Sequence, residues 1–155
     1  MADLKISIAK TLVNEGGYTD TIGDPGDATK YGVTQADMPN VNIKDITEEQ
    51  ATTYYQEHYV KALYSDIAAQ AVADKLFDMG VLFGIGTAVK ILQETLGIEA
   101  DGDFGPETLT DTNGADPVVL LQNYKTRLVS HALAIVEEKP ALRKFITGWI
   151  RRVNL

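Results

Sequence analysis

Apolar residues recur along this chain at helical spacing, and no stretch alternates apolar and polar residues for long enough to form a good strand. Leu4, Ile8 and Leu12 stand four residues apart and therefore share one helical face, with Asp3 as a cap before them. A chain of 155 residues suits one compact unit, or two small lobes that share a core. The sequence therefore predicts a mainly α-helical protein.

Start and stop signals divide the rest of the chain into further helices. Thr47-Glu48-Glu49-Gln50 has the capping-box pattern of a helix start. Asp116-Pro117 places a cap before a proline at the first helical position, and Pro140 ends that helix. One expected helix begins at Thr47 and runs to Ala62, and another begins near Pro106. The others cover residues 67–82, 88–96, 117–139 and 141–152.

A carboxylate followed by two glycines closes the first helix, at Glu15-Gly16-Gly17-Tyr18. The glycines let the chain turn sharply, so no bulky neighbour blocks a cleft beside the acid. Residues 16–34 are rich in Gly, Asp and Thr, which predicts a loop with room for a small β-hairpin. This loop contains a second carboxylate, Asp24. Two carboxyl groups that face each other across a groove can together catalyse the hydrolysis of a glycosidic bond.

The two carboxyl groups would need different surroundings. A proton donor must keep its proton near neutral pH, which burial against apolar surface favours, and Leu12, Val13 and Tyr18 can supply that surface around Glu15. Asp24 lies in an open polar loop and suits a group that stays ionised. Alternatively, Glu15 only ends a helix and Asp24 only forms a turn. A Glu15 carboxyl locked against an arginine, or pointing into bulk solvent, would contradict the proton-donor role.

Composition excludes several other chemistries. The chain has no cysteine, so disulfides, thiolate nucleophiles and thiolate metal sites are excluded. Its two histidines, His58 and His131, are far apart in sequence and offer little material for a zinc site or a Ser-His-Asp triad. A formal net charge of −8 argues against nucleic acid as a partner, because non-specific binding to it rests on clustered Lys and Arg.

The sequence also bears on location. No segment approaches the roughly 20 apolar residues of a membrane span, so we expect no stable membrane insertion. The first residues lack the basic and apolar regions of a signal peptide. We therefore expect synthesis in the cytoplasm, with a separate route to any substrate outside it. A monomer is favoured, although the sequence leaves the oligomeric state open.

The loop motifs resemble the signature of glycoside hydrolase family 108. Its elements here are Glu-Gly-Gly-Tyr at 15–18 and Asp-Pro-Gly-x-x-Thr-x-x-Gly-Val-Thr at 24–34. The family comprises lysozyme-like N-acetylmuramidases, often described as secretion activator proteins and frequently encoded by phages or prophages. The resemblance covers almost the whole chain. Further motifs follow in the expected order, at Tyr54-Tyr55, Tyr59, Asp78-Met79-Gly80, Leu92-Gln93, Leu96-Gly97, 101–108 and 148–153.

The resemblance implies a lysozyme-like fold and a hydrolase that cleaves the β-1,4 bond between N-acetylmuramic acid and N-acetylglucosamine. Glu15 matches the catalytic acid, and Asp24 with Thr29 would position or deprotonate the attacking water. Thr29 is one residue short of the spacing in phage lysozymes, and Asp27 stands where the family usually has glycine. No metal or organic cofactor is required. The expected partner is the glycan strand of peptidoglycan, reached in the cell wall after release or export.

The break at Gly84–Gly86 is the best candidate boundary. The resemblance implies a catalytic lobe over residues 1–88 and a predicted peptidoglycan-binding lobe over residues 89–155, packed as one unit. In the second lobe, Asp101 and Phe104 are candidate ligand contacts. Calcium is a weak alternative for this stretch, because the twelfth position from Asp101 is Thr112 rather than glutamate. A turn before the helix near Pro106 is the better interpretation.

Aromatic and hydroxyl side chains complete the candidate substrate site. Sugar faces stack on aromatic rings, and phenol hydroxyls bond sugar hydroxyls. Tyr18, Tyr31 and Thr34 lie in the loop and are candidates for this role. Tyr55 is a further candidate, although its i, i+4 spacing with Tyr59 is also typical of a core position.

Two other functions fit the same motifs. A non-catalytic protein that binds peptidoglycan or assists secretion would keep the lysozyme scaffold without cleaving the polymer. A lytic transglycosylase would use Glu15 alone, with a hydroxyl of the sugar itself as the nucleophile. Cell-wall clearing separates the enzyme from the binder, and anhydro ends in the products identify the transglycosylase.

Overall fold

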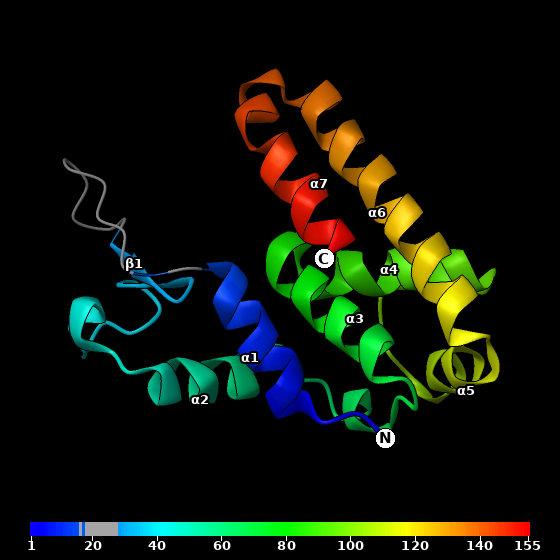
Figure 1. Cartoon of the computed structure of the whole chain (residues 1–155), viewed down its shortest axis with the longest axis horizontal. Helices are drawn as coiled ribbons and strands as arrows, with labels where there is room; N and C mark the ends of the chain where they lie inside the picture. Colours follow the sequence, from blue (N-terminus) through cyan, green and yellow to red (C-terminus); the bar gives the residue numbers. More distant parts are fainter. Residues whose placement is uncertain (16, 18–27) are drawn as a thin grey trace.

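The computed structural model describes residues 1–15, 17 and 28–155, and it confirms a mainly helical, lysozyme-like fold (Figure 1). A two-stranded antiparallel hairpin accompanies the helices. The elements, in chain order, are α1 Leu4–Glu15, β1 Thr29–Lys30, β2 Val33–Thr34, the 3-10 helix η1 Ile43–Asp45, α2 Glu48–Tyr59, the 3-10 helix η2 Tyr64–Asp66, α3 Gln70–Phe83, α4 Ile85–Leu96, α5 Pro106–Gly114, α6 Pro117–Glu138, the 3-10 helix η3 Pro140–Phe145 and α7 Ile146–Asn154.

Helix α1 lies between two groups of elements, with the hairpin and α2 on one side and α3 to α7 on the other (Figure 1). Two apolar clusters fill these parts. One joins α3, α4 and α6 through residues such as Leu76, Leu92 and Leu128, and the other joins α1, α2 and the hairpin around Ile8. Phe77 of α3 belongs to the second cluster. Helix α3 therefore contributes to both clusters and holds the two sides together.

The predicted helix caps are present. Thr47 Oγ1 accepts from the Gln50 amide at 3.2 Å, and Gln50 Oε1 accepts from the Thr47 amide at 2.9 Å, which is the expected capping box. Asp116 Oδ1 accepts from the amides of Val118 and Val119 at 2.9 and 3.0 Å. Across the described residues, no helix combines the length and apolar character needed to cross a bilayer.

Three predicted helix boundaries differ from the structure. Helix α2 ends at Tyr59, and Val60 is extended, so Ala62 lies outside the helix. Helix α3 begins at Gln70 rather than at residue 67, because the Ile67 amide closes the preceding 3-10 turn on the Tyr64 carbonyl. Helix α4 begins at Ile85, three residues earlier than expected.

The end of the chain also differs from the expected helix over residues 141–152. Pro140 ends α6, as predicted, but residues Pro140–Phe145 form a 3-10 helix before α7 begins at Ile146. Both helix types satisfy local backbone groups, so the apolar pattern alone does not separate them. As a result α7 is shorter than predicted and extends to Asn154.

The hairpin matches the small one expected in the 16–34 region. Thr29 pairs with Thr34 and Lys30 pairs with Val33, so Tyr31 and Gly32 form a two-residue connection. Both connecting residues have positive φ, 55° for Tyr31 and 75° for Gly32. Two-residue hairpin turns with positive φ at both positions match the natural twist of the strands. This turn places the hairpin tip against the end of α1.

Candidate functional site

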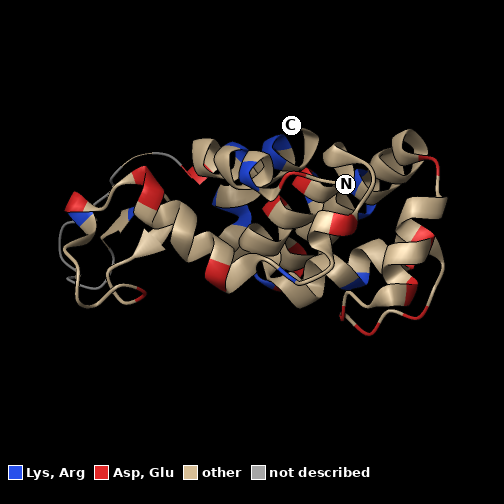
Figure 2. Cartoon of the chain, turned by 90° about the horizontal axis from the view of Figure 1, so that it is seen from below, with Lys and Arg blue, Asp and Glu red and all other residues tan. Residues whose placement is uncertain are grey.

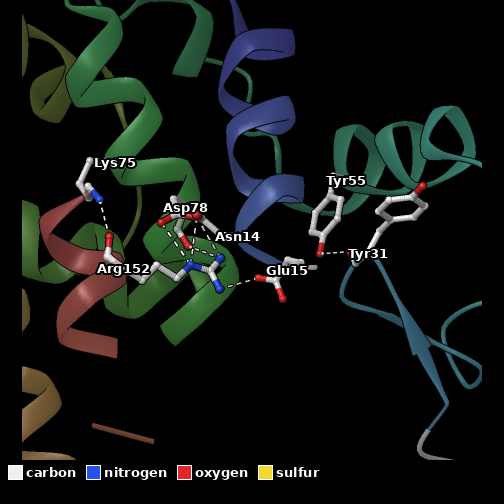
Figure 3. A network of polar contacts seen from close by, with 7 residues as sticks. All are labelled: Asn14, Glu15, Tyr31, Tyr55, Lys75, Asp78 and Arg152. Carbon is white, nitrogen blue, oxygen red and sulfur yellow. Dashed lines mark hydrogen bonds and ion pairs between the residues drawn. The ribbon is translucent and has the colours of Figure 1, made fainter. Parts of the chain in front are cut away.

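Glu15, the last residue of α1, packs its carboxyl group against the tip of the hairpin. A Cβ atom added to Gly32 would lie 2.7 Å from Glu15 Oε2 and 2.5 Å from the Tyr55 hydroxyl. That hydroxyl donates to the Tyr31 carbonyl at 3.0 Å (Figure 3). Glycine at position 32 therefore lets the backbone approach the carboxyl closely. The hairpin, α2 and α1 meet at this point.

The other oxygen of Glu15 is paired with arginine. Arg152 of α7 places Nη1 2.6 Å from Glu15 Oε1. Its Nε lies 3.1 and 3.2 Å from the two carboxyl oxygens of Asp78, and its Nη2 lies 2.9 Å from Asp78 Oδ1 (Figure 3). Their side chains are 19% exposed for Glu15, 13% for Arg152 and 8% for Asp78. We call these three residues the Glu15 network.

Arg152 remains charged in this setting. Burial by itself would lower its pKa, but the hydrogen bonds and negative charge of Asp78, together with Glu15, raise the pKa above its ordinary value. The network thus holds one positive charge between two acidic side chains. Helices α1, α3 and α7 are joined through it.

This ion pair with arginine is the arrangement that the sequence analysis gave as contradicting the proton-donor role of Glu15, so that role stays a proposal. Pairing with arginine needs the carboxylate, whereas a proton donor must begin as the acid. Arg152 is shared, however, because Asp78 takes both Nε and Nη2. Only one oxygen of Glu15 faces the guanidinium, and the other packs on the hairpin tip.

Lysine side chains fix the end of α7 that carries Arg152. Lys75 Nζ donates to the Arg152 carbonyl at 2.9 Å, and Lys125 Nζ donates to the Asn154 carbonyl at 3.0 Å. Carbonyl groups in the last turn of a helix lack partners within the helix, and cations there are favourable. Asn14 Nδ2 adds a long contact of 3.4 Å to Asp78 Oδ1. Arg152 is therefore held through both its backbone and its side chain.

The buried Lys75 gives a pH-dependent prediction. Burial lowers its pKa to about 8, against 10.5 for an ordinary lysine. Between these values the unfolded chain holds more protons than the folded one, so this residue makes the free energy of unfolding rise with pH. From pH 7.5 to 9.5, urea unfolding is expected to show the wild type gaining about 1–2 kcal/mol relative to Lys75→Met. A difference that stays constant with pH would contradict this.

The structure describes only some of the remaining loop residues that the sequence predicted for the site. Asp24 and Tyr18 lie outside the described residues. Thr29 and Thr34 pair across the hairpin, and the Thr34 hydroxyl donates to Asp37 Oδ2 at 2.7 Å. The Asp37 amide donates back to Thr34 Oγ1 at 3.2 Å, so the two residues together close a turn after the hairpin. A ligand role for Thr34 stays a prediction.

The tyrosines occupy different surroundings. Tyr55 is buried, with 1% of its surface exposed, and burial raises its pKa far above the ordinary range, with the charge of Glu15 adding to the effect. Tyr31 is half-buried, and its carbonyl rather than its hydroxyl meets Tyr55. The structure thus brings Glu15, Tyr31 and Tyr55 together. Tyr55 supports the hairpin tip, while its predicted contact with substrate is untested.

Asp101 and Phe104 lie in the turn between α4 and α5, as predicted. Gly102 has φ 82°, and Asp101 Oδ1 accepts from the Asp103 amide at 2.8 Å and from Gln93 Nε2 at 2.7 Å. These bonds lower the pKa of Asp101, the backbone bond most. Phe104 is 6% exposed, and its ring packs edge-on against that of Tyr64 with 5.1 Å between the ring centroids. Core packing is therefore sufficient to explain an aromatic residue at this position. Contact of either residue with peptidoglycan stays a prediction.

Arg152, Asp78 and Lys75 are site residues that reasoning from the sequence missed. The pair Arg151-Arg152 is too small a cluster to indicate a polyanion site by itself. Asp78 and Arg152 do fall in two of the segments that carry the family resemblance, at 78–80 and 148–153. The motifs at 78–80 and 148–153 were the only sequence signal that pointed to Asp78 and Arg152. Helical periodicity by itself marks Asp78 only as a polar residue in an apolar face.

Gly32 offers a test of the close approach to Glu15. Gly32→Ala is expected to lower the free energy of unfolding by more than the roughly 1–2 kcal/mol that a left-handed backbone costs a non-glycine residue, because the new methyl group would overlap Glu15 and Tyr55. Gly97→Ala is the matched control, since its φ is 76° and nothing lies within 4 Å. Equal losses in urea unfolding would contradict the close packing.

Comparisons with known proteins match two separate parts of the chain. Residues 8–84 match the model of glycosyl hydrolase 108, and residues 87–154 match that of a predicted peptidoglycan domain. A solved structure described as "Structure of Brucella abortus SagA" aligns over 97% of this chain and 91% of that chain, with 27% identity and a TM-score of 0.73. No curated protein matches the chain. The chain therefore belongs to the glycosyl hydrolase 108 family over residues 8–84 and carries a predicted peptidoglycan domain over residues 87–154.

Proposed function

We propose that the protein is a peptidoglycan hydrolase that cleaves the β-1,4 bond between N-acetylmuramic acid and N-acetylglucosamine. The observation that carries the proposal is the position of Glu15, which ends α1 against the hairpin tip and lies in the region that matches glycosyl hydrolase 108. The match of residues 87–154 to a predicted peptidoglycan domain supports the same polymer as substrate.

In this proposal Glu15 gives its proton to the oxygen that bridges the two sugars. Asp24, acting together with Thr29, positions or deprotonates a water molecule that attacks the anomeric carbon. The water supplies a hydroxyl to one sugar, and the departing sugar keeps the proton from Glu15. The reaction needs no metal or organic cofactor.

The ion pair with Arg152 sets a condition on this mechanism. Before Glu15 can act as a donor it must take up a proton, and a protonated carboxyl no longer attracts the guanidinium as an ion. Asp78 already holds Arg152 through two nitrogens, so the guanidinium keeps a charged partner when Glu15 becomes neutral. The shared arrangement therefore lowers the cost of breaking the contact with Glu15.

A second function is favoured by the same ion pair. If Glu15 remains a carboxylate fixed by Arg152, the scaffold binds peptidoglycan without cleaving it, as in a protein that assists secretion. Both functions place the protein at the cell wall.

Purified peptidoglycan sacculi separate the two functions. After incubation with the protein, the suspension is centrifuged, and new reducing ends and protein are measured in both fractions. A hydrolase releases soluble fragments with new reducing ends. A binder sediments with the sacculi and releases none, and that result would overturn the proposed cleavage.

A further inference from the structure

A groove of about 690 Å³ runs beside the Glu15 network and is not explained by the proposed chemistry. Arg152 lines it, and so does Asn14, the residue before Glu15, so the groove continues directly from the network. Its other walls come from α7 and from the ends of α1 and α3. The side chains that matter here are Trp149, Arg151, Val13 and Leu82. We call it the Trp149 groove.

The charge of the Trp149 groove is opposite to that of the whole chain. Arg151 and Arg152 line it, and among the described residues no Asp or Glu side chain does, although the chain has a net charge of −8. Figure 2 shows a group of Lys and Arg residues beside the C-terminal end of the chain. The groove therefore favours an anionic ligand.

Arg151 is the cation that can meet such a ligand. Arg152 is committed to Glu15 and Asp78 and is 13% exposed, whereas Arg151 is exposed. Within the described residues, no carboxylate lies at ion-pair distance from Arg151. An arginine can hold a carboxylate with two parallel hydrogen bonds.

The rest of the groove presents apolar and aromatic surface. Trp149 is half-buried. Its ring is edge-on to Phe83, with 5.9 Å between the ring centroids, and stacked on Phe145, with 6.1 Å between the centroids. These ring contacts hold the indole in place. Val13, which also lines the groove, is 81% exposed. A groove that combines apolar side chains with an exposed arginine suits a short peptide with free carboxylates better than a bare sugar chain.

From these features we infer that the Trp149 groove holds the stem peptide of peptidoglycan, an inference that rests on the proposed function. The glycan backbone is neutral, and the carboxylates of the polymer are on the short peptides attached to N-acetylmuramic acid. A strand that placed its scissile bond at Glu15 would carry a stem peptide within reach of the adjoining groove. Arg151 would bind a peptide carboxylate, and Trp149 and Val13 would contact its apolar part.

The test compares two glycan ligands of equal length, one with stem peptides and one stripped of them by an amidase. The lactyl carboxylates that the amidase leaves on N-acetylmuramic acid are then capped as neutral methylamides. Binding is measured by calorimetry in the Glu15→Gln background, which prevents cleavage. The peptide-bearing strand is expected to bind about tenfold more tightly, as one hydrogen-bonded charge pair can provide. Arg151→Gln, added to this background, is expected to bring the ratio of the two dissociation constants toward one. Arg127→Gln, on α6 outside the groove, is the matched control and is expected to keep the ratio.

The outcomes separate the inference from the proposed function. Equal binding of the two ligands, or a ratio that survives Arg151→Gln, would overturn the inference while leaving the hydrolase proposal in place. Loss of the ratio in Arg127→Gln as well would indicate a general charge effect and would also overturn it. No binding of either ligand, together with no cleavage by the wild type, would overturn both.

Discussion

Glu15→Gln is expected to lower the rate of peptidoglycan cleavage by roughly 10²–10⁴-fold, the range that a positioned general acid contributes. The substitution removes the proton that protonates the leaving oxygen. It keeps the shape of the side chain, and the amide oxygen can still accept from Arg152 Nη1, which lies 2.6 Å from the present carboxyl oxygen. Release of reducing ends from purified sacculi measures the rate, and circular dichroism confirms that the variant folds.

A second acidic residue provides the control for this loss. Glu94→Gln makes the same chemical change on α4, where the side chain is 53% exposed and its nearest arginine nitrogen is 3.8 Å away. This variant is expected to keep wild-type activity. Near-normal cleavage by Glu15→Gln would show that another group donates the proton.

Arg152→Met is expected to lower the free energy of unfolding by about 3–5 kcal/mol, the cost of leaving a buried charge without its partner. Asp78 has a side chain only 8% exposed, and Arg152 supplies its ion pair. Methionine replaces the apolar stem of arginine and removes the guanidinium. Urea unfolding of both proteins at pH 7 measures the difference.

The partner residue makes this prediction specific. In the Arg152→Met background, Asp78→Leu removes the stranded carboxylate and is expected to recover part of the lost stability, because the two side chains act as a pair. Arg143→Met, on the exposed 3-10 helix η3, is the control and should change stability by less than about 0.5 kcal/mol. A loss of under about 1 kcal/mol in Arg152→Met would show that the ion pair with Asp78 contributes little.

Much of the fold follows from local signals, because a helix cap depends on a few adjacent residues. Thr47 and Gln50 satisfy each other within one turn, and Asp116 caps the residues directly after it. The predicted α-helix was wrong at residues 67–69 and 141–145, because their apolar pattern fits an extended or a 3-10 segment as well as an α-helix. Contacts with other elements decide between these conformations, and a single sequence does not display such contacts.

The candidate site divides in the same way. The motif at 15–18 and the Gly32 turn are local, so Glu15 and the hairpin could be found from the sequence. Asp78 and Arg152 are 74 positions apart, and only the tertiary fold brings their side chains together. Their charges have no spacing rule in the sequence. The pairing that most affects Glu15 was therefore beyond prediction from composition and motifs.

Mass spectrometry of the soluble products of digested peptidoglycan, with wild type beside Glu15→Gln, tests the central claim most directly. The account predicts that the wild type releases fragments that end in reducing N-acetylmuramic acid, each one water heavier than the corresponding anhydro-ended fragment. The variant is expected to release almost none. Anhydro ends would instead identify a lytic transglycosylase. Equal yields from the two proteins, or no fragments from either, would contradict a hydrolase that depends on Glu15.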